Sequence, residues 1–281
     1  MKAIKALSIA RQKLKQKNIT SYQIDALILL SFLLNLSKEQ IIFNHDLELD
    51  ENKYQQFLDL IKQRLSYRPV SQIIGKREFF GEDFIINSSV LDPRPDSETL
   101  IEATLDIFKN NHQELKILEL GIGSGCLLLT LLKKIPSASG VGIDIDNNAL
   151  KVAAKNAELL KLQNRINLVQ SDWFNNLKPQ KFDLIISNPP YIPTQTIESL
   201  QPEVKDHEPR IALDGGNDGL DCYVKIASCV NNFLKNEAVL MVEIGQNQKT
   251  DVTGIFKKAG LQLVAEKKDL GGIVRCLGFK K

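Results

Sequence analysis

The sequence has few cysteines, no long apolar run and no excess of charge of either sign. None of its four cysteines forms a pair spaced as C-x-x-C, which argues against a zinc or redox site and favours reduced thiols. The longest apolar run, residues 27–34, falls far short of the roughly 18 residues that a membrane-spanning helix requires. The amino-terminal segment also lacks the uninterrupted apolar core of a signal peptide. With 36 basic and 34 acidic residues, the net charge of +2 gives no reason to expect nucleic acid as a partner. We therefore expect a cytoplasmic protein that binds neither membranes nor, directly, nucleic acid.

The first part of the chain, residues 1–70, has the pattern of a helical domain. At 281 residues and 43% hydrophobic content, the chain is long enough for two domains with buried cores. Apolar residues recur at spacings of three and four throughout residues 1–70, which predicts a bundle of four or five helices. Thr20 with Gln23, and Ser37 with Gln40, have the spacing of capping boxes at helix starts.

The rest of the chain changes pattern twice. Residues 71–92 contain short β-like pieces separated by glycine (SQIIG, REFFG, DFIINSSVL), which predicts a β-hairpin linker. Residues 93–281 begin with a helix expected over 97–110 and then alternate apolar strands with helices. This alternation predicts an α/β domain with a doubly wound, mostly parallel sheet, whose ligands bind beyond the carboxyl ends of the strands.

A glycine-rich turn follows the first strand of this domain, in the stretch LELGIGSGC. Gly121, Gly123 and Gly125 allow a sharp turn and a close approach of backbone to ligand. The third glycine follows the second too closely for a dinucleotide fingerprint, and no Walker lysine follows, so diphosphates and triphosphates are disfavoured. The acidic Glu119 just before the turn suits a ligand that carries positive charge. A plain glycine-rich connection between a strand and a helix is the alternative.

The next two strands also end in residues suited to an adenosine. Asp144 can accept hydrogen bonds from both hydroxyls of a ribose, whereas Asp146 has the position of a helix cap. Asp172 can accept from an adenine amino group, and Trp173 either stacks on the ring or packs in the core. The glycine turn, the ribose acid and the acidic-aromatic pair at three successive strand ends together point to S-adenosylmethionine as cofactor.

The fourth strand ends in the sequence Asn188-Pro189-Pro190-Tyr191. The two prolines lack amide donors and form a rigid turn, so the strand stops at Asn188. A planar nitrogen, such as a carboxamide, is a poor nucleophile because its lone pair is delocalised. The side-chain oxygen of Asn188 and the carbonyl of Pro189 can hold such a nitrogen for in-line attack and stabilise the developing positive charge, while Tyr191 covers its face. A stiff loop without a catalytic role is the simpler alternative.

These elements together closely resemble the release factor glutamine methyltransferase family (PrmC/HemK). The resemblance covers nearly all of the chain and rests on RPVSQIIGKREFFG, VLDPRPDSE, the LELGIGSG loop, SDWF, NPPY and EPRIALDGGNDGLDCY. It implies a seven-stranded class I methyltransferase sheet, and methylation of the glutamine amide (N5) in the Gly-Gly-Gln motif of peptide-chain release factors, with S-adenosylmethionine as cofactor and no metal. We also expect a monomer, and we expect the helical domain to dock the substrate, because it lacks a catalytic motif and accompanies a site that takes a protein loop. By this resemblance the cofactor site includes the glycine turn, with Ile122 and Ser124, and also Asp144, Trp173 and Asn188, while the NPPY residues grip the glutamine.

The chain departs from the family pattern at Asp92 and Ser88, where an apolar residue and a proline are usual. Asp92 places a charge where an apolar side chain would pack. The neighbouring Arg94 and Asp96 match the pattern, although without the resemblance they are better interpreted as a solvated turn. Two other activities share the NPPY element: methylation of a glutamine in a large-subunit ribosomal protein, and N6 methylation of adenine in nucleic acid. A binding module without catalysis is the remaining alternative.

Overall fold

A computed structural model describes residues 1–109 and 114–281, and the chain divides into two compact units. The first comprises residues 1–76 together with 201–207, and the second comprises residues 77–200 and 208–281. Residues 201–207 thus belong with the helical part of the chain, a grouping that no local sequence pattern indicated. The predicted end of a helix at residue 110 lies outside the described residues.

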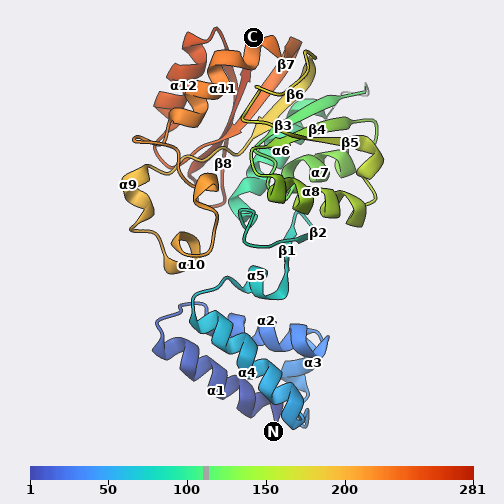
Figure 1. Ribbon diagram of the computed structural model, residues 1–281, viewed down its shortest axis with the longest axis vertical. Helices are drawn as coiled ribbons and strands as arrows, with labels where there is room; N and C mark the ends of the chain where they lie inside the picture. Colours follow the sequence, from blue (N-terminus) through green and yellow to red (C-terminus); the bar gives the residue numbers. More distant parts are fainter. Residues whose placement is uncertain (110–113) are drawn as a thin grey trace. The chain divides into compact units, whose positions relative to one another are not determined.

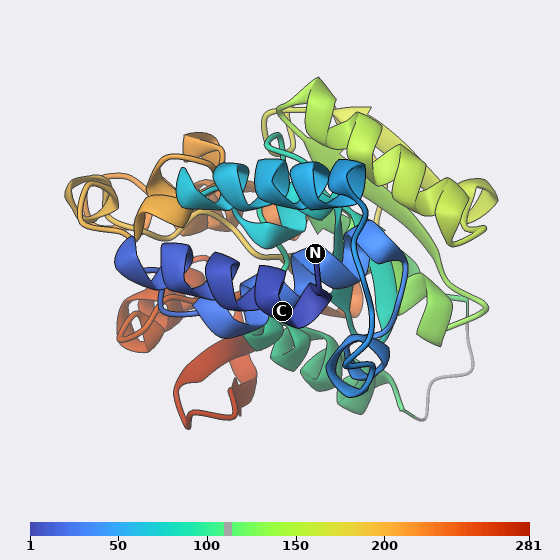
Figure 2. The same cartoon turned by 90° about the horizontal axis from the view of Figure 1, so that it is seen from below.

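The first unit is a small bundle of helices, as its apolar periodicity predicts. The helices are α1 (Ala3–Gln16), α2 (Tyr22–Leu34), α3 (Lys38–Phe43), α4 (Glu51–Leu65), α5 (Val70–Ile74) and, from the later segment, α10 (Pro202–Lys205). Helices α1, α2 and α4 pack against one another (Figure 2). Their shared core includes Leu14, Leu30 and Phe57. Of the two predicted capping boxes, the one at Ser37 and Gln40 is confirmed by reciprocal hydrogen bonds.

The other two local predictions for this part of the chain are wrong. The residue at the N-cap of α2 is Ser21 rather than Thr20, and its hydroxyl donates to the Asp25 carboxylate instead of capping the helix. The stretch SQIIG, predicted as β-like, is helix α5, which begins after Pro69 and ends at Gly75 with φ +76°. Proline before the first turn and glycine in the left-handed conformation at the end are helix boundary signals, and they outweighed the β-branched residues between them.

The second unit contains a two-stranded hairpin and a seven-stranded sheet. The hairpin pairs β1 (Lys76–Phe79) with β2 (Glu82–Ile85), so the predicted hairpin is confirmed over a shorter stretch. The sheet has the order β5-β4-β3-β6-β7-β9-β8, with the last two strands antiparallel to their neighbours. Its strands are β3 (Lys116–Leu120), β4 (Ser139–Asp144), β5 (Ile166–Gln170), β6 (Phe182–Ser187), β7 (Leu234–Glu243), β8 (Gln262–Lys268) and β9 (Val274–Lys280). The sheet is therefore mostly parallel, as predicted.

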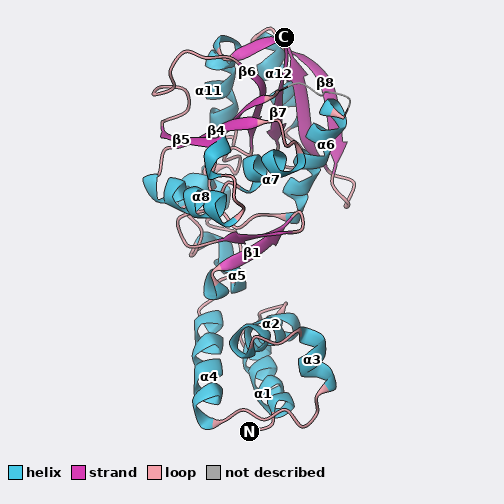
Figure 3. Cartoon of the chain, turned by 90° about the vertical axis from the view of Figure 1, so that its right-hand side faces the viewer, coloured by secondary structure: helices cyan, strands magenta, loops and turns pink. Residues whose placement is uncertain are grey.

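Helices cover both faces of this sheet (Figures 1 and 3). One face packs against α6 (Glu98–Phe108), α7 (Cys126–Lys134) and α8 (Asn147–Leu159). The other packs against α11 (Asp221–Cys229) and α12 (Lys249–Lys258), and the short helix α9 (Thr194–Ile197) follows β6. Because both faces are covered, the central strands are apolar along almost their whole length; only one residue of β6 is not fully buried.

The order in which successive strands are added to the sheet reverses at β3, and the parallel strands β3 and β6 lie side by side at this point. From β3 the chain proceeds outward through β4 to β5, whereas β6 and β7 lie on the other side of β3. Leu120 and Ser187, the last residues of β3 and β6, are directly paired, and the Ser187 hydroxyl donates to the Leu120 carbonyl at 2.9 Å. In an open α/β sheet this switch point is where a ligand binds. None of the described helices is long and apolar enough to cross a membrane.

Candidate active site

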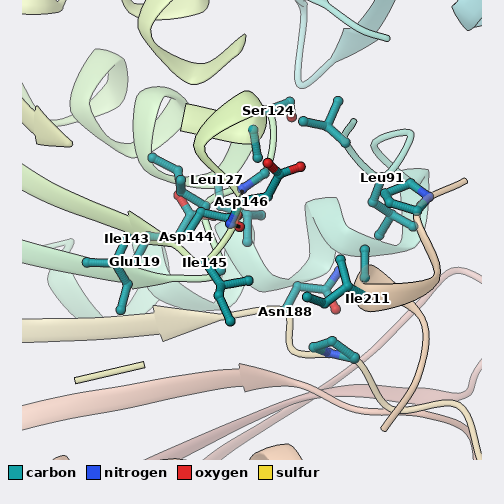
Figure 4. A pocket seen from close by; sticks show the side chains of 18 of the residues that line it. Leu91, Glu119, Ser124, Leu127, Ile143, Asp144, Ile145, Asp146, Asn188 and Ile211 are labelled. Atoms are coloured by element: carbon teal, nitrogen blue, oxygen red, sulfur yellow. Dashed lines mark hydrogen bonds between the residues drawn. The ribbon is translucent and has the colours of Figure 1, made fainter. Parts of the chain in front are cut away.

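A cavity of about 260 Å³ lies at this switch point and gathers most of the residues predicted from the sequence. Glu119, Gly121, Ile122, Gly123, Ser124, Asp144, Asp172, Trp173, Asn188 and Pro190 line it. Figure 4 shows Glu119 and Asp144 together at the ends of their strands, with Asn188 and Ile211 grouped to one side. Gly125, Pro189 and Tyr191 are not among the lining residues. Across the described parts of the chain, no group of side chains is arranged to hold a metal ion.

The Asp144 carboxylate is hydrogen-bonded to the backbone of the glycine turn. Its Oδ2 accepts from the Gly123 amide and its Oδ1 from the Asp146 amide, each at 2.9 Å. Each carboxylate oxygen retains a further lone pair for a ligand hydroxyl. Burial raises the pKa of Asp144, partly offset by these two amide donors. As predicted, Asp146 caps α8, accepting from the Asn148 amide at 2.8 Å.

Glu119 lies deeper, as the penultimate residue of β3. It is 2% exposed, and its carboxyl accepts from the Leu128 amide in the first turn of α7 at 3.0 Å. Burial raises the pKa of this carboxyl well above its usual value, and the neighbouring Asp144 adds to the shift. A positively charged ligand in the cavity would oppose both effects, which fits the sulfonium group of S-adenosylmethionine.

Gly125 has a packing role that explains its absence from the cavity wall. It lies at the N-cap of α7 with φ +80°, where a Cβ would approach the Leu129 Cδ1 atom to 3.0 Å. The third glycine of the turn therefore lets α7 pack closely, while Gly121 and Gly123 line the cavity.

Trp173 adopts an unusual backbone conformation at the edge of the cavity. Its φ is +50°, a value that a bulky residue rarely adopts. The Ser171 hydroxyl donates to the Trp173 carbonyl at 2.7 Å and accepts from the Asn176 amide, which holds the turn in place. The ring is half-buried against the core and also lines the cavity, so core packing is observed, and stacking on the adenine stays a prediction. Asp172 also lines the cavity and is exposed.

Asn188 follows β6 directly, as the two prolines predict. Its side-chain amide donates from Nδ2 to the Ser97 hydroxyl at 3.2 Å, a contact across 91 residues of sequence. The side-chain oxygen of Asn188 is therefore turned away from Ser97. It remains available as an acceptor at the cavity.

The loop after Asn188 is held by a second loop, residues 208–220, which contains the EPRIALDGGNDGL stretch. Ile192 donates to the Leu213 carbonyl and accepts from the Gly215 amide, at 3.0 and 2.9 Å. The Gln248 side chain also donates to the Tyr191 carbonyl at 3.0 Å. These contacts fix the backbone of the NPPY turn from outside its own sequence.

Without the family pattern, Arg94 and Asp96 are predicted to form a solvated turn, and no local pattern indicates a role for Glu208. Arg94 lines the cavity and pairs with the buried Glu208 at 2.6 Å. Burial raises the pKa of Glu208 to about 7, while Arg94 lowers it and Asp92 raises it. The unusual Asp92 is itself buried and lies 3.8 Å from the Arg77 guanidinium. The charge is thus accommodated within a polar cluster rather than an apolar one.

Fold and site together define an S-adenosylmethionine-dependent class I methyltransferase. The family model of the PrmC N-terminal domain matches residues 5–75, and that of the Methyltransferase small domain matches residues 96–204. The fold is also similar to the hMettl16 catalytic domain solved with a MAT2A 3′UTR hairpin, with a TM-score of 0.58, 16% identity and coverage of 85% of both chains.

Two curated relatives carry the comparison further. The release factor glutamine methyltransferase of Caulobacter vibrioides is 39% identical over 95% of this chain and 92% of its own length. That of Rhodospirillum rubrum is 42% identical over 94% of this chain and 81% of its own length. The chain belongs to the release factor glutamine methyltransferase family, as its motifs predict.

Proposed function

We propose that this protein transfers a methyl group from S-adenosylmethionine to the side-chain amide nitrogen of the glutamine in the Gly-Gly-Gln motif of a peptide-chain release factor. The family supplies the substrate class. The observation that carries the chemistry is the Asn188 side chain, whose nitrogen is engaged by Ser97 and whose oxygen is left for a substrate N–H group.

Residues at the carboxyl ends of several strands would each bind a different part of the cofactor. S-adenosylmethionine supplies an electrophilic methyl group on a sulfonium sulfur. Asp144 would accept from the ribose hydroxyls with the lone pairs that Gly123 and Asp146 leave unused, and Trp173 and Asp172 would contact the adenine. The buried Glu119 would complement the positive charge.

At the substrate end, this chain positions the amide and stabilises the charge it acquires. The Asn188 oxygen and the Pro189 carbonyl would accept the two N–H groups of the glutamine amide and align its nitrogen. As positive charge develops on that nitrogen, both acceptors bind it more strongly, which favours the transition state over the ground state. Tyr191 would pack on the amide plane. The methylated nitrogen is then acidic enough to lose a proton to water, so no general base is required.

The test offers the purified protein labelled S-adenosylmethionine with a release factor, a large-subunit ribosomal protein and DNA in separate reactions. We expect label on the release factor alone, located by mass spectrometry at the glutamine of the Gly-Gly-Gln motif. Label on the ribosomal protein or on adenine would replace this substrate assignment. We further propose that the protein is a cytoplasmic monomer that binds its substrate without nucleic acid. Light scattering of the free protein tests the monomer, and light scattering of its mixture with release factor tests binding in the absence of nucleic acid.

A further inference from the structure

A buried carboxyl group lies behind the NPPY turn. Glu243 is the last residue of β7, the strand next to β6, and is 2% exposed. Its Oε1 accepts from the Tyr191 hydroxyl at 3.3 Å, and the nearby Ser97 side chain lowers the pKa of the same carboxyl. Its Oε2 is buried and has no hydrogen-bond partner within residues 1–109 and 114–281. An incompletely bonded buried carboxyl destabilises a fold, so an apolar side chain would be the more stable choice at this position.

The hydrogen-bond roles in this cluster determine which way the Asn188 amide faces. Ser97 accepts from Asn188 Nδ2 at 3.2 Å, so its single hydroxyl proton is free to point to Glu243, and an ionised carboxyl there can only accept. The Ser97 oxygen is then left as an acceptor. Asn188 must therefore present its NH₂ group to Ser97, at the observed 3.2 Å, and its oxygen must face the other way. A neutral partner in place of the carboxylate would remove this constraint, because the Ser97 proton could then turn to the Asn188 oxygen.

We propose that Glu243 is a positioning residue: by accepting from Ser97 and Tyr191, it holds the Asn188 oxygen and the Tyr191 ring in the orientation that receives the substrate amide. This inference rests on the proposed function, since it concerns the same amide site. Glu243 does not line the cavity, and neither hydrogen bond of the Asp144 carboxylate involves it.

The charge state of Glu243 gives this arrangement a pH dependence. Burial raises the pKa of Glu243 to about 7, partly offset by the Ser97 and Tyr191 hydrogen bonds and by Arg275. The constrained orientation is therefore present above that pKa and lost as the pH falls through it. The other titratable groups that interact with this carboxyl come from four neighbouring elements and are Asp96, Cys126, Tyr223 and Cys276. The thiols and both tyrosines titrate well above this range, because burial raises their pKa values further.

The test compares wild type with Glu243→Gln and Ser97→Ala, and uses Tyr223→Phe as the matched control. Tyr223 donates to the backbone carbonyl of Glu243, so its loss perturbs the same strand end while leaving the Tyr191 hydrogen bond to the Glu243 carboxyl in place. We expect Glu243→Gln and Ser97→Ala to lower kcat for release factor by roughly 10- to 100-fold, with cofactor affinity by calorimetry unchanged. The rate of wild type should fall as the pH drops through about 7, and that fall should be absent in Glu243→Gln.

Because the pKa values of Glu208 and Glu119 are also raised, an unchanged acid limb in Glu243→Gln would assign the limb to another carboxyl group and overturn the proposal. So would a kcat equal to that of Tyr223→Phe. A second measurement needs no substrate: the side-chain amide ¹⁵N resonance of Asn188 should shift with a midpoint near 7 in wild type and not in Glu243→Gln. Absence of that shift in wild type contradicts the positioning role. Its presence in a protein that fails to methylate release factor would support the positioning role and contradict the substrate assignment instead.

Discussion

Asp144 is already bonded to two backbone amides in the structure, so its carboxylate is held in one orientation before a ligand binds. The position of this acidic residue at a strand end could be predicted from the sequence. The strand pattern places it at the correct edge of the sheet, and its side chain is too short to reach elsewhere. Asn188 could be selected for the same reason. Ser97 and Glu243 could not, because their importance depends on contacts across long separations in sequence, which periodicity does not report.

Replacing Asp144 with alanine should weaken S-adenosylmethionine binding by tenfold or more. Each charge-assisted hydrogen bond to a ribose hydroxyl contributes about 1.5–3 kcal/mol, and the glycine turn also loses its anchor at Gly123. Isothermal calorimetry measures the change. Asp146→Asn is the matched control. It also removes an acidic group near the cavity, and asparagine can still cap helix α8 at this position. Equal affinities for Asp144→Ala and the control would rule out the ribose assignment.

The loop of residues 208–220 packs so closely on the NPPY turn that some positions of the loop have no room for a side chain. Gly219 has φ +78°, and a Cβ there would lie 2.3 Å from the Tyr191 carbonyl oxygen. The clustered glycines of this stretch do not indicate by themselves which backbone the loop approaches. That contact depends on the relative positions of β6 and the loop, which only the assembled sheet defines.

Gly219→Ala should therefore displace Tyr191 and lower the methyl-transfer rate by roughly tenfold or more while the protein stays folded. Gly272→Ala separates this effect from backbone strain. Gly272 has a similar φ of +81°, and a Cβ there meets nothing within 4 Å. Rates are compared at saturating substrate, with thermal unfolding as the measure of stability. If both variants lose activity equally, close packing on Tyr191 is not the cause.

Within the helical unit, one buried arginine joins two parts of the chain. Arg64 is 4% exposed and pairs with Asp25 at 2.7 Å and with Glu203 of the 201–207 segment at 2.8 Å. Arg64→Met would leave two carboxylates without their cation, at a cost of about 3–5 kcal/mol in the free energy of unfolding. Lys2→Met, which removes an exposed pair with Asp46, should cost at most about 1 kcal/mol. Urea denaturation of both variants tests this, and similar losses would contradict a structural role for Arg64.

For the molecule as a whole, the helical periodicity and the strand–helix alternation were enough to predict two domains and a doubly wound sheet. They were not enough to show that residues 201–207 pack with the helical unit. That segment is short and polar, and its contacts include an ion pair to Arg64 and a hydrogen bond from Gln72 to the His207 carbonyl, across 135 residues or more. No local pattern encodes such pairings.

Deleting residues 1–70 should leave S-adenosylmethionine binding largely intact, because every residue that lines the cavity belongs to the second unit. Methylation of intact release factor should fall, since the deletion removes the proposed recognition domain and frees the 201–207 segment between the NPPY turn and Glu208. Calorimetry and a methylation assay on the same folded preparation measure the two effects. Loss of cofactor binding in a folded truncation would show that the helical unit helps to build the cofactor site.

If Asn188 activates a substrate amide, replacing it must change the single-turnover rate of methyl transfer to release factor. Asn188→Ala should lower this rate by roughly a hundredfold or more without unfolding the protein, because both prolines of the turn remain. Asn188→Asp keeps an acceptor oxygen and should retain an intermediate rate. If folded Asn188→Ala methylates the release factor glutamine as fast as wild type, the NPPY turn is only a rigid connection and the proposed activation of the amide is wrong.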